Sequence, residues 1–354
     1  MALSFSTAEG RAFYPETVEY LLREACPSIQ YRVRRELLSQ SETSKEMLAL
    51  PKEILHDKVV ERIAQQQRPD GSLGTRFHTA ETRSNYSTEV AIRLLSEKGI
   101  SRHHPLLSKA LRALRGKDER FAREFFRVGR ILDSKGFGGS SLIRAALFAR
   151  AGVENEPFVQ EQVTKSLRAF EAVSKVNSVS DLAKMNRGKL VFKPDALWPC
   201  IYHLRLLAFT SRWRSSSNIA RVAASIRHLL GLVPLPPTYV REKSHHIAPC
   251  GVLNSKLGNT TKPIQRDSVW FENMELMSRA GVIKKVPDLQ AGLMWLAKVI
   301  HANNGKFVEL VASENYTKWS AYTGLALEKD WRSKRRRICD LTFRSLLILH
   351  HSAA

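Results

Sequence analysis

The sequence predicts an almost entirely helical protein, and three observations indicate this fold class. Apolar residues recur at steps of three and four through most of the 354 residues. Sustained alternation of apolar and polar residues, the pattern of a half-buried strand, is not found. Repeats on the scale of one helical hairpin with its loops indicate stacked arrays or closed rings. The glycines that open turns at this interval are Gly71, Gly136, Gly188, Gly251 and Gly305.

The predicted helices follow one another along the chain. Pro27 interrupts the first helical hairpin, and Pro69-Asp70-Gly71, a strong turn signal, separates the two helices of the second. Gly152 closes a later helix at its C-terminal end. The runs cover residues 14–25, 29–38, 59–66, 87–99, 105–114, 120–132, 142–152, 159–173, 199–209, 219–230, 270–279, 289–302 and 340–351.

Two segments between the helices lack helical periodicity. The shorter one is a turn that begins at Gly188 and ends at Pro194. The longer one, residues 239–267, is irregular and rich in proline and glycine, and a loop of this length in a compact domain is usually functional or disordered. We therefore expect a single domain over residues 1–354 that carries one long irregular loop at 239–267.

The composition suits a helical domain with an acidic partner. A hydrophobic content of 43% is enough for a sizeable core. The formal net charge of +22 favours nucleic acid, an anionic membrane, or phosphorylated and pyrophosphorylated small molecules. The alternative explanation of the charge is solubility or a basic proteome background, because charge bears on association and not on fold.

The cysteines and the hydropathy pattern predict a cytoplasmic protein. Cys26, Cys200, Cys250 and Cys339 are widely spaced and form no CxxC pair, which favours a reducing compartment over a disulfide framework. Residues 1–9 lack the basic and apolar regions of a signal peptide. Uncharged runs stay shorter than the ~18 residues that a helix crossing a bilayer needs, so we expect no transmembrane segment.

The turn at residues 67–73 resembles a known repeat. Gln67-x-x-x-Gly71-x-Leu73 is similar to the Q-x-x-x-G-x-W repeat of squalene and oxidosqualene cyclases, with leucine at the tryptophan position. The helix at 87–99 resembles the one that follows this repeat in terpene cyclases and protein prenyltransferase β-subunits. Lys135-Gly136-Phe137-Gly138-Gly139 resembles a GGFGG turn of the prenyltransferases, and His301-x-x-x-Gly305-x-Phe307 is a weaker match.

This resemblance implies an α/α toroid, in which inner and outer helices alternate around a central cavity. In such a turn the glycine lets the chain reverse, and the glutamine side chain bonds exposed backbone groups at a helix end. The resemblance does not carry the family chemistry, because the D-x-D-D and D-D-x-x-D sequences of the cyclases and synthases are absent. Residues 316–325 resemble the segment with the zinc-binding histidine of the prenyltransferases, but Thr317 and Ser320 cannot replace an imidazole.

Three carboxylates and several aromatic residues are candidates for chemistry in such a cavity. An acid in an apolar chamber has the raised pKa that a proton donor needs, and the alternative role is helix capping, for which Asp340 is well placed. Aromatic faces stabilise carbocations, and the alternative role is plain core packing. The candidate acids are Asp133, Asp195 and Asp340, and the candidate ligand-binding aromatics are Trp198, Tyr202, Trp270, Trp319 and Tyr322.

A metal site and a polyanion surface are the other two candidates. Cys200 and His203 share a helix face, and with His246 and Cys250 of the long loop they could hold zinc; the alternative is a buried thiol with a hydrogen-bonded histidine. A run of arginines at steps of three and four could contact phosphates, and the alternative is a solvated outer helix face. These arginines are Arg112, Arg115, Arg120, Arg123, Arg127 and Arg130.

Two functional hypotheses follow. The first is a toroid protein whose central apolar cavity binds or acts on an isoprenoid-like or diphosphate ligand. The alternative is a basic helical-array protein that binds nucleic acid or another polyanion. The sequence leaves open the substrate, the reaction, the metal content and the oligomeric state.

Overall fold

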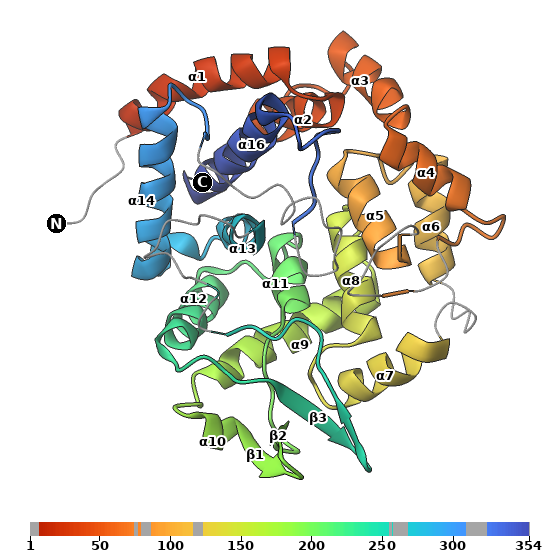
Figure 1. Cartoon of the computed structure of the whole chain (residues 1–354), viewed down its shortest axis with the longest axis vertical. Coiled ribbons are helices and arrows are strands. Elements are labelled where there is room, and N and C mark those ends of the chain that lie inside the picture. The colour runs from red at the N-terminus through yellow and green to blue at the C-terminus, as the bar shows by residue number, and fades with distance from the viewer. Residues whose placement is uncertain are drawn as a thin grey trace.

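The computed structural model describes residues 7–73, 77–78, 86–115, 123–254, 257, 268–308 and 324–353. Helices account for most of this part of the chain (Figure 1). They are α1 (Thr7–Glu24), α2 (Pro27–Arg32), the π-helical η1 (Val33–Leu37), α3 (Lys45–Leu55), α4 (Lys58–Gln66), α5 (Thr88–Glu97), α6 (Pro105–Arg115), α7 (Arg123–Ser134), α8 (Ser140–Arg150), α9 (Pro157–Val173), α10 (Val179–Leu182), α11 (Ile201–Ala208), α12 (Ser216–Gly231), α13 (Ser268–Arg279), the 3₁₀ turn η4 (Ile283–Lys285), α14 (Pro287–Ala302) and α16 (Lys334–Ala353).

The prediction of an all-α toroid is wrong, because four strands form a mixed sheet in the order β1-β2-β3-β4. The strands are β1 (Ala183–Asn186), β2 (Lys189–Phe192), β3 (Thr238–Glu242) and β4 (His245–Ile247). The outer pairs are antiparallel, with Ala183 opposite Phe192 and Val240 opposite Ile247. The central pair, β2 and β3, is parallel, with Leu190 opposite Thr238. The fold therefore mixes helices with a small sheet, which lies at the bottom of Figure 1.

The strands are short, and this explains why periodicity does not reveal them. Each has three to five residues, too few for an alternating pattern to stand out. Arg187 and Gly188, the two residues between β1 and β2, both have positive φ, which is the backbone of the type I′ hairpin turn. Residues 238–247, most of which we predicted to be irregular, form the β3–β4 hairpin, whereas residues 258–267 of that loop lie outside the described chain.

The predicted turn at residues 67–73 is confirmed in its hydrogen bonding. Gln67 Nε2 donates to the carbonyl oxygens of Gly71 at 3.0 Å and Leu106 at 2.8 Å, so it ties the end of α4 to the start of α6. Gly71 has a φ of 89°, and a Cβ there would lie 2.5 Å from the carbonyl oxygen of Lys109. Only glycine fits this backbone and this close approach.

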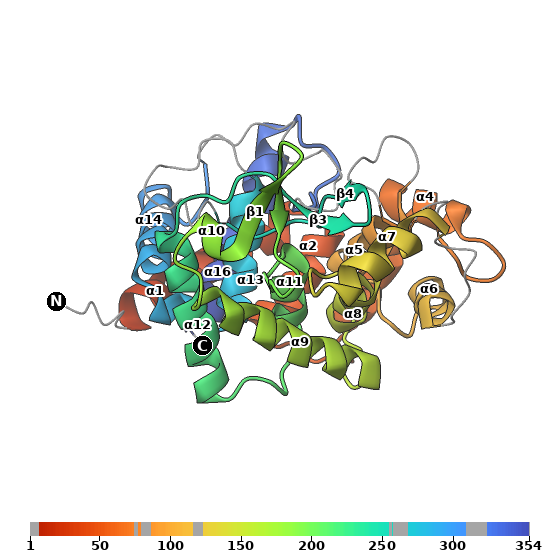
Figure 2. The same ribbon diagram turned by 90° about the horizontal axis from the view of Figure 1, so that it is seen from below.

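Helices α5, α8, α11, α13 and α16 contact one another in chain order, and α16 in turn contacts η1 and α1. They lie around the centre of the molecule in Figure 1, and α9 and α12 pack outside them toward the sheet. Figure 2 shows the same layers from below, with α9 beneath α8 and α11. None of the helices within the described ranges combines the length and apolar content that a bilayer crossing requires.

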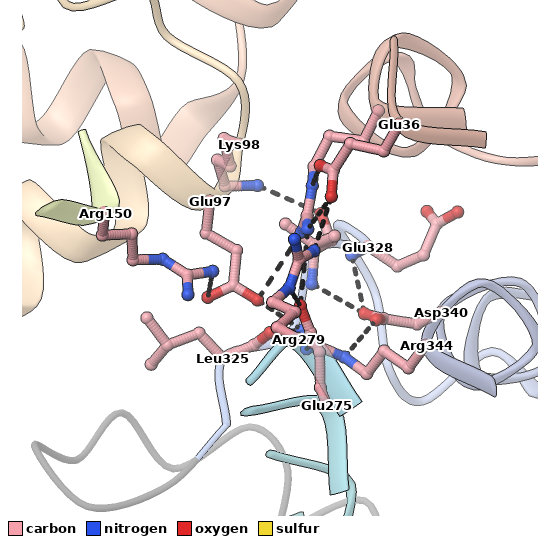
Figure 3. Close-up of polar contacts among 12 residues, drawn as sticks. Glu36, Glu97, Lys98, Arg150, Glu275, Arg279, Leu325, Glu328, Asp340 and Arg344 are labelled. Carbon is pink, nitrogen blue, oxygen red and sulfur yellow. Dashed lines mark hydrogen bonds and ion pairs between the residues drawn. The ribbon is translucent and has the colours of Figure 1, made fainter. Parts of the chain in front are cut away.

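The centre of the molecule holds ion pairs (Figure 3). Glu97 at the end of α5 lies 3.0 Å from Arg344 of α16 and 3.3 Å from Arg150 of α8. Arg279 of α13 joins Glu275, 2.9 Å away, to Glu36 of η1, 2.5 Å away. We call these residues, with Arg32 and Asp340, the central charge network. Its side chains are at most 13% exposed, so the expected central apolar cavity is replaced, among the described residues, by charged groups.

Mutual pairing keeps these groups ionised. Burial alone would raise the pKa of Glu97, but the guanidinium groups of Arg150, Arg344 and Arg32 lower it to about 2. Burial would likewise raise the pKa of Glu275, and Arg279 and Arg32 hold it below its usual value. Removing one member therefore leaves charges without a partner in a place with little access to water.

We predict that Glu97→Gln lowers the free energy of unfolding by about 3–5 kcal/mol, because Arg150, Arg344 and Arg32 lose a shared anion in a buried place. Urea denaturation measures the change. The control is Arg335→Ala, which breaks a pair with Glu24 by a side chain that is 63% exposed and should change stability by less than about 1 kcal/mol. Equal losses in the two variants would contradict the proposed importance of the network.

Candidate functional site

A thiol, an imidazole and a carboxylate from three distant segments form a continuous chain of contacts. His78 Nδ1 lies 2.5 Å from Glu89 Oε2, and the opposite ring nitrogen, Nε2, lies 3.8 Å from Cys250 Sγ. The imidazole is therefore between the carboxylate and the sulfur, with one nitrogen for each. We call Cys250, His78 and Glu89 the thiol triad.

The start of α5 positions two members of the triad. Ser87 caps the helix by accepting from Val90 N at 3.3 Å, which places Glu89 in the first turn, where the helix dipole favours a negative charge. The backbone N–H of Glu89 donates to the carbonyl oxygen of Phe77 at 3.0 Å, and Phe77 is buried. His78 is the next residue, so this bond and the anchored ring hold its side chain over Glu89.

A second backbone connection positions the thiol. Cys250 follows β4, and the residues after it run antiparallel to the start of α11, with Ile201 N donating to Gly251 O at 2.8 Å. Trp198 Nε1 donates to Leu253 O at 2.7 Å and fastens the same segment. Gly251 has a φ of 61°, a conformation that favours glycine, so the chain turns directly after the cysteine.

Glu89 is held ionised by several donors. The Tyr202 hydroxyl donates to Oε1 at 2.7 Å, and Arg205 Nη1 lies 3.5 Å from the same oxygen. Burial would raise the pKa of Glu89, but the hydrogen bond and charge of His78, with the charges of Arg205 and Arg93, hold it below its usual value. A carboxylate held in this way orients the imidazole and stabilises its protonated form.

His78 is accordingly a cation at neutral pH. Burial would lower its pKa, but the hydrogen bonds and charges of Cys250 and Glu89 raise it to about 9. A protonated imidazole that contacts a cysteine sulfur is the acid–base partner that cysteine nucleophiles use. The triad thus combines a nucleophile, an acid–base group and an orienting group in the order that acyl-transfer chemistry uses.

Cys200 and His203 form a second, different cysteine–histidine pair. His203 Nδ1 accepts from the backbone N–H of Cys200 at 2.9 Å and lies 3.2 Å from its sulfur. Burial lowers the pKa of His203 to about 4 and raises the pKa of Cys200 to about 12. Both groups are therefore neutral, and this pair matches the interpretation of a buried thiol beside a hydrogen-bonded histidine.

The structure does not bring the four expected zinc ligands together. Cys200 and His203 are adjacent and Cys250 contacts His78, but His246 Nε2 lies 3.2 Å from Asn186 Oδ1 and its ring is edge-on to Tyr239. Within the described residues, no group of three histidine, cysteine, aspartate or glutamate side chains is arranged to hold a metal ion.

The three candidate acids lie in different environments. Asp133 accepts from Ser140 Oγ at 3.2 Å and Ser141 N at 3.0 Å, which is the capping role at the start of α8. Asp195 is exposed in the turn before α11. Asp340 is fully buried inside α16, which begins at Lys334, so it is not the N-cap that the sequence suggested.

Asp340 instead anchors the segment before its own helix. Its Oδ2 accepts from Leu327 N at 2.6 Å, Glu328 N at 3.1 Å and Trp331 Nε1 at 3.0 Å, while Oδ1 pairs with Arg344 at 2.9 Å. Both carboxylate oxygens of Asp340 therefore have hydrogen-bond or ion-pair partners, and the residue has a structural role in the central charge network.

The candidate aromatic residues are mostly part of the core. Trp198 is buried with its nitrogen bonded, and Trp270 is buried edge-on to Phe271 and Trp295. Tyr202 lines a small central cavity and contacts the thiol triad. Trp319 and Tyr322 lie outside the described residues.

The arginines of the predicted stripe that the structure describes are on the surface. Arg112, Arg127 and Arg130 are exposed, and Arg115 is 52% exposed and pairs with Glu156 at 2.5 Å. Arg120 lies outside the described residues, and so does the side chain of Arg123.

Sequence reasoning missed His78 and Glu89, although one signal pointed to Glu89. Glu89, Arg93 and Glu97 are four residues apart and share one face of α5, and the other faces carry apolar residues. A helix without a solvated face is buried all round, so its charged stripe must lie inside the protein. His78 has no such signal, because only the folded chain brings it to Glu89 and Cys250.

Comparison with known proteins gives no match: no family model, curated protein or solved structure is significantly similar to this chain. The relationship to terpene cyclases and prenyltransferases therefore stays a prediction from the residues that resemble their turns.

We predict that the contacts of the protonated His78 with Cys250 and Glu89 stabilise the protein fully below pH 6.5, and that this contribution falls as pH rises through about 9, where the imidazolium loses its proton. The loss should reach about 3 kcal/mol, at about 1.4 kcal/mol for each unit of pKa shift. Thermal unfolding of the wild type and His78→Gln between pH 6 and 10 measures it, and the difference between them should shrink over this range. His56→Gln, at a side chain that is 83% exposed, should show no such trend.

Proposed function

We propose that this protein is a cysteine-dependent enzyme of acyl transfer or hydrolysis, with Cys250 as the nucleophile. The observation that carries the proposal is the contact chain from Cys250 Sγ through both nitrogens of His78 to Glu89. A buried thiol with a plain structural role has no need of an imidazolium beside it, nor of a carboxylate that fixes the far ring nitrogen.

The geometry assigns each group a step. The Cys250 thiolate attacks the carbonyl carbon of an ester, thioester or amide and forms a tetrahedral intermediate. As the intermediate collapses, His78 gives its Nε2 proton to the leaving group, and the acyl group remains on sulfur. Neutral His78 then takes a proton from water, the resulting hydroxide attacks the thioester, and the Cys250 thiolate and a carboxylic acid are released.

Glu89 stays ionised throughout this cycle. Its contacts to Tyr202 and Arg205 fix the carboxylate, and its contact to His78 Nδ1 fixes the ring so that Nε2 faces sulfur. The role resembles that of the carboxylate in other acyl-transfer triads, which orients the imidazole and does not itself become protonated. A free cysteine nucleophile also suits the reducing cytoplasm that the cysteine pattern predicts.

The pH dependence of alkylation tests whether the thiol is activated. We expect the rate of Cys250 modification by iodoacetamide, followed by peptide mass spectrometry, to change less than about threefold between pH 6 and 8.5. In His78→Ala the rate should rise about tenfold per pH unit, as for an ordinary thiol with a pKa of about 8.5. The ratio of the alkylation rates of one protein at two pH values does not depend on how well the reagent reaches the sulfur. Cys200→Ser, which leaves the triad intact, should behave as the wild type.

Acylation tests the reaction itself. With an activated ester such as p-nitrophenyl acetate, we expect one acetyl group on Cys250 in intact-protein mass spectra, and none in Cys250→Ser. Glu89→Gln should acetylate at least about tenfold more slowly, since the neutral amide stabilises the imidazolium less. Acetylation spread evenly over lysines, with the Cys250→Ser variant unchanged, would overturn the proposal.

A second candidate function, binding of nucleic acid or another polyanion, is supported by the distribution of charge. The arginines of the central charge network face carboxylates, so the excess of +22 has to reside elsewhere. Part of it is exposed on two successive helices, as Lys109 and Arg112 of α6 and Arg127 and Arg130 of α7. Such a surface suits a phosphate backbone.

Salt titration distinguishes this function. We expect the affinity for a single-stranded oligonucleotide, measured by fluorescence anisotropy, to fall with rising NaCl at a log–log slope of about −0.7 for each phosphate contact. Arg112→Glu with Arg130→Glu should weaken binding at least about tenfold and flatten the slope. Lys175→Glu, an exposed charge at the end of α9, is the matched control. If the double arginine variant and Lys175→Glu bind the oligonucleotide with equal affinity, this surface is not the binding site.

A further inference from the structure

A proline-rich link, residues 233–237, lies in the connection between α12 and β3 (Figure 1). Its sequence is Val233-Pro234-Leu235-Pro236-Pro237. Each proline ring fixes φ at about −65°, and each residue before a proline is disfavoured in the helical region. Every residue of the link is one or the other, so the whole link favours the polyproline II backbone. Leu232, just before it, already has this backbone, with a φ of −78° and a ψ of 155°.

Burial along the connection repeats every third residue, which is the period of a polyproline II helix. Leu232 and Leu235 are partly buried and pack against the hydrophobic core, and Thr238 is buried. The residues between them face outward, because Val233 is 78% exposed and all three prolines are exposed. One edge of this short helix is therefore anchored to the protein, and the other two edges are open to solvent.

The outward residues form two pairs, each an apolar residue followed by a proline. The pairs are Val233-Pro234 and Pro236-Pro237, and the inward Leu235 separates them. Pro234 and Pro237 are one turn apart, so the two pairs point in the same direction with a spacing of about 9 Å. A PxxP segment in this conformation is what the aromatic-lined grooves of polyproline-binding domains recognise.

The backbone of the link is also accessible to a partner. In the described part of the chain, no hydrogen bond reaches the carbonyl oxygens of Val233, Pro234 or Leu235. Tryptophan and tyrosine side chains of a groove carry an N–H or O–H that needs such an acceptor. The prolines and the anchored edge already hold the link in one conformation, so its binding costs little conformational entropy.

Exposed cations precede and follow the link. Arg227 is near the end of α12, and Arg241 is in β3. Lys189 of the neighbouring β2 lies over the Tyr239 ring, 5.0 Å from its centroid. These charges favour a groove with acidic residues beside its aromatic pockets, because opposite charges across an interface speed association and select the partner.

We propose that residues 233–237 are the docking site for a polyproline-binding domain of the SH3 type, whose two aromatic-lined pockets each take one of the two proline pairs. Leu235 stays on the core side and needs no pocket. A WW domain that reads Pro-Pro-x-Tyr fits less well, because Tyr239 of Pro236-Pro237-Thr238-Tyr239 pairs with Val191 in the sheet and its ring contacts Lys189. The site uses no residue of the thiol triad.

A panel of purified SH3 domains tests the proposal with the full chain. We expect the protein to bind at least one immobilised domain in biolayer interferometry, and an isotope-labelled sample of that domain to show chemical-shift changes at its aromatic groove. Pro234→Ala with Pro237→Ala should weaken this binding at least about tenfold, because both pockets lose their proline. Pro157→Ala, at an exposed proline that begins α9, should bind as the wild type.

Val233→Glu separates recognition from folding. The side chain is 78% exposed, so the variant should keep the Tm of the wild type and still bind at least about tenfold more weakly, since a charge then enters an apolar pocket. The proposal is overturned if no SH3 domain of the panel binds, if a WW domain binds in its place, or if the proline double variant and the wild type bind with equal affinity. Cys250→Ser should bind unchanged, so this result is separate from any test of acyl transfer.

Discussion

Every buried charge at the centre of this protein needs a partner from another element, and the rest of the structure depends on this constraint. Glu97 of α5 is reached by Arg344 from α16, Arg150 from α8 and Arg32 from α2. An apolar helix face can rotate or slide by a fraction of a turn at modest cost. A buried ion pair cannot, because a displaced carboxylate would leave a stranded guanidinium. The network therefore fixes the rotation of α5, α8, α13 and α16 about their own axes.

The thiol triad extends this constraint toward chemistry. Glu89, Arg93 and Glu97 are on one face of α5, so the helix rotation that places Glu97 among the central arginines also places Glu89 beneath His78. The donors that keep Glu89 ionised, Tyr202 and Arg205, are one turn apart on α11. The position of the carboxylate is thus set by structure that extends well beyond the site, and the imidazole takes its charge and orientation from that carboxylate.

The small sheet positions the sulfur of Cys250, the third member of the thiol triad. The β3–β4 hairpin belongs to a sheet that joins residues 183–192 to residues 238–247, and Cys250 lies three residues after the end of β4. An ion pair of 3.5 Å between Glu242 and Lys135 ties the hairpin to the end of α7. The strands are short, but they turn the segment we expected to be irregular into one that reaches the start of α11 in a fixed register.

The sequence by itself determined the features that depend on near neighbours. Helix periodicity, the break at Pro27 and the reversal at Gly71 with its bonded Gln67 all follow from backbone geometry within a few residues. Strands of three to five residues escaped detection, because they are too short for alternation to stand out and the central pair joins residues 48 positions apart, such as Leu190 and Thr238. The spacing of Glu89, Arg93 and Glu97 could also have indicated a buried charged stripe, although we did not predict one. The partners of these charges could not be predicted, because the fold alone decides which residues come within ion-pair distance of a buried charge. Only the tertiary structure decided that His78 and Cys250, 172 positions apart, would meet.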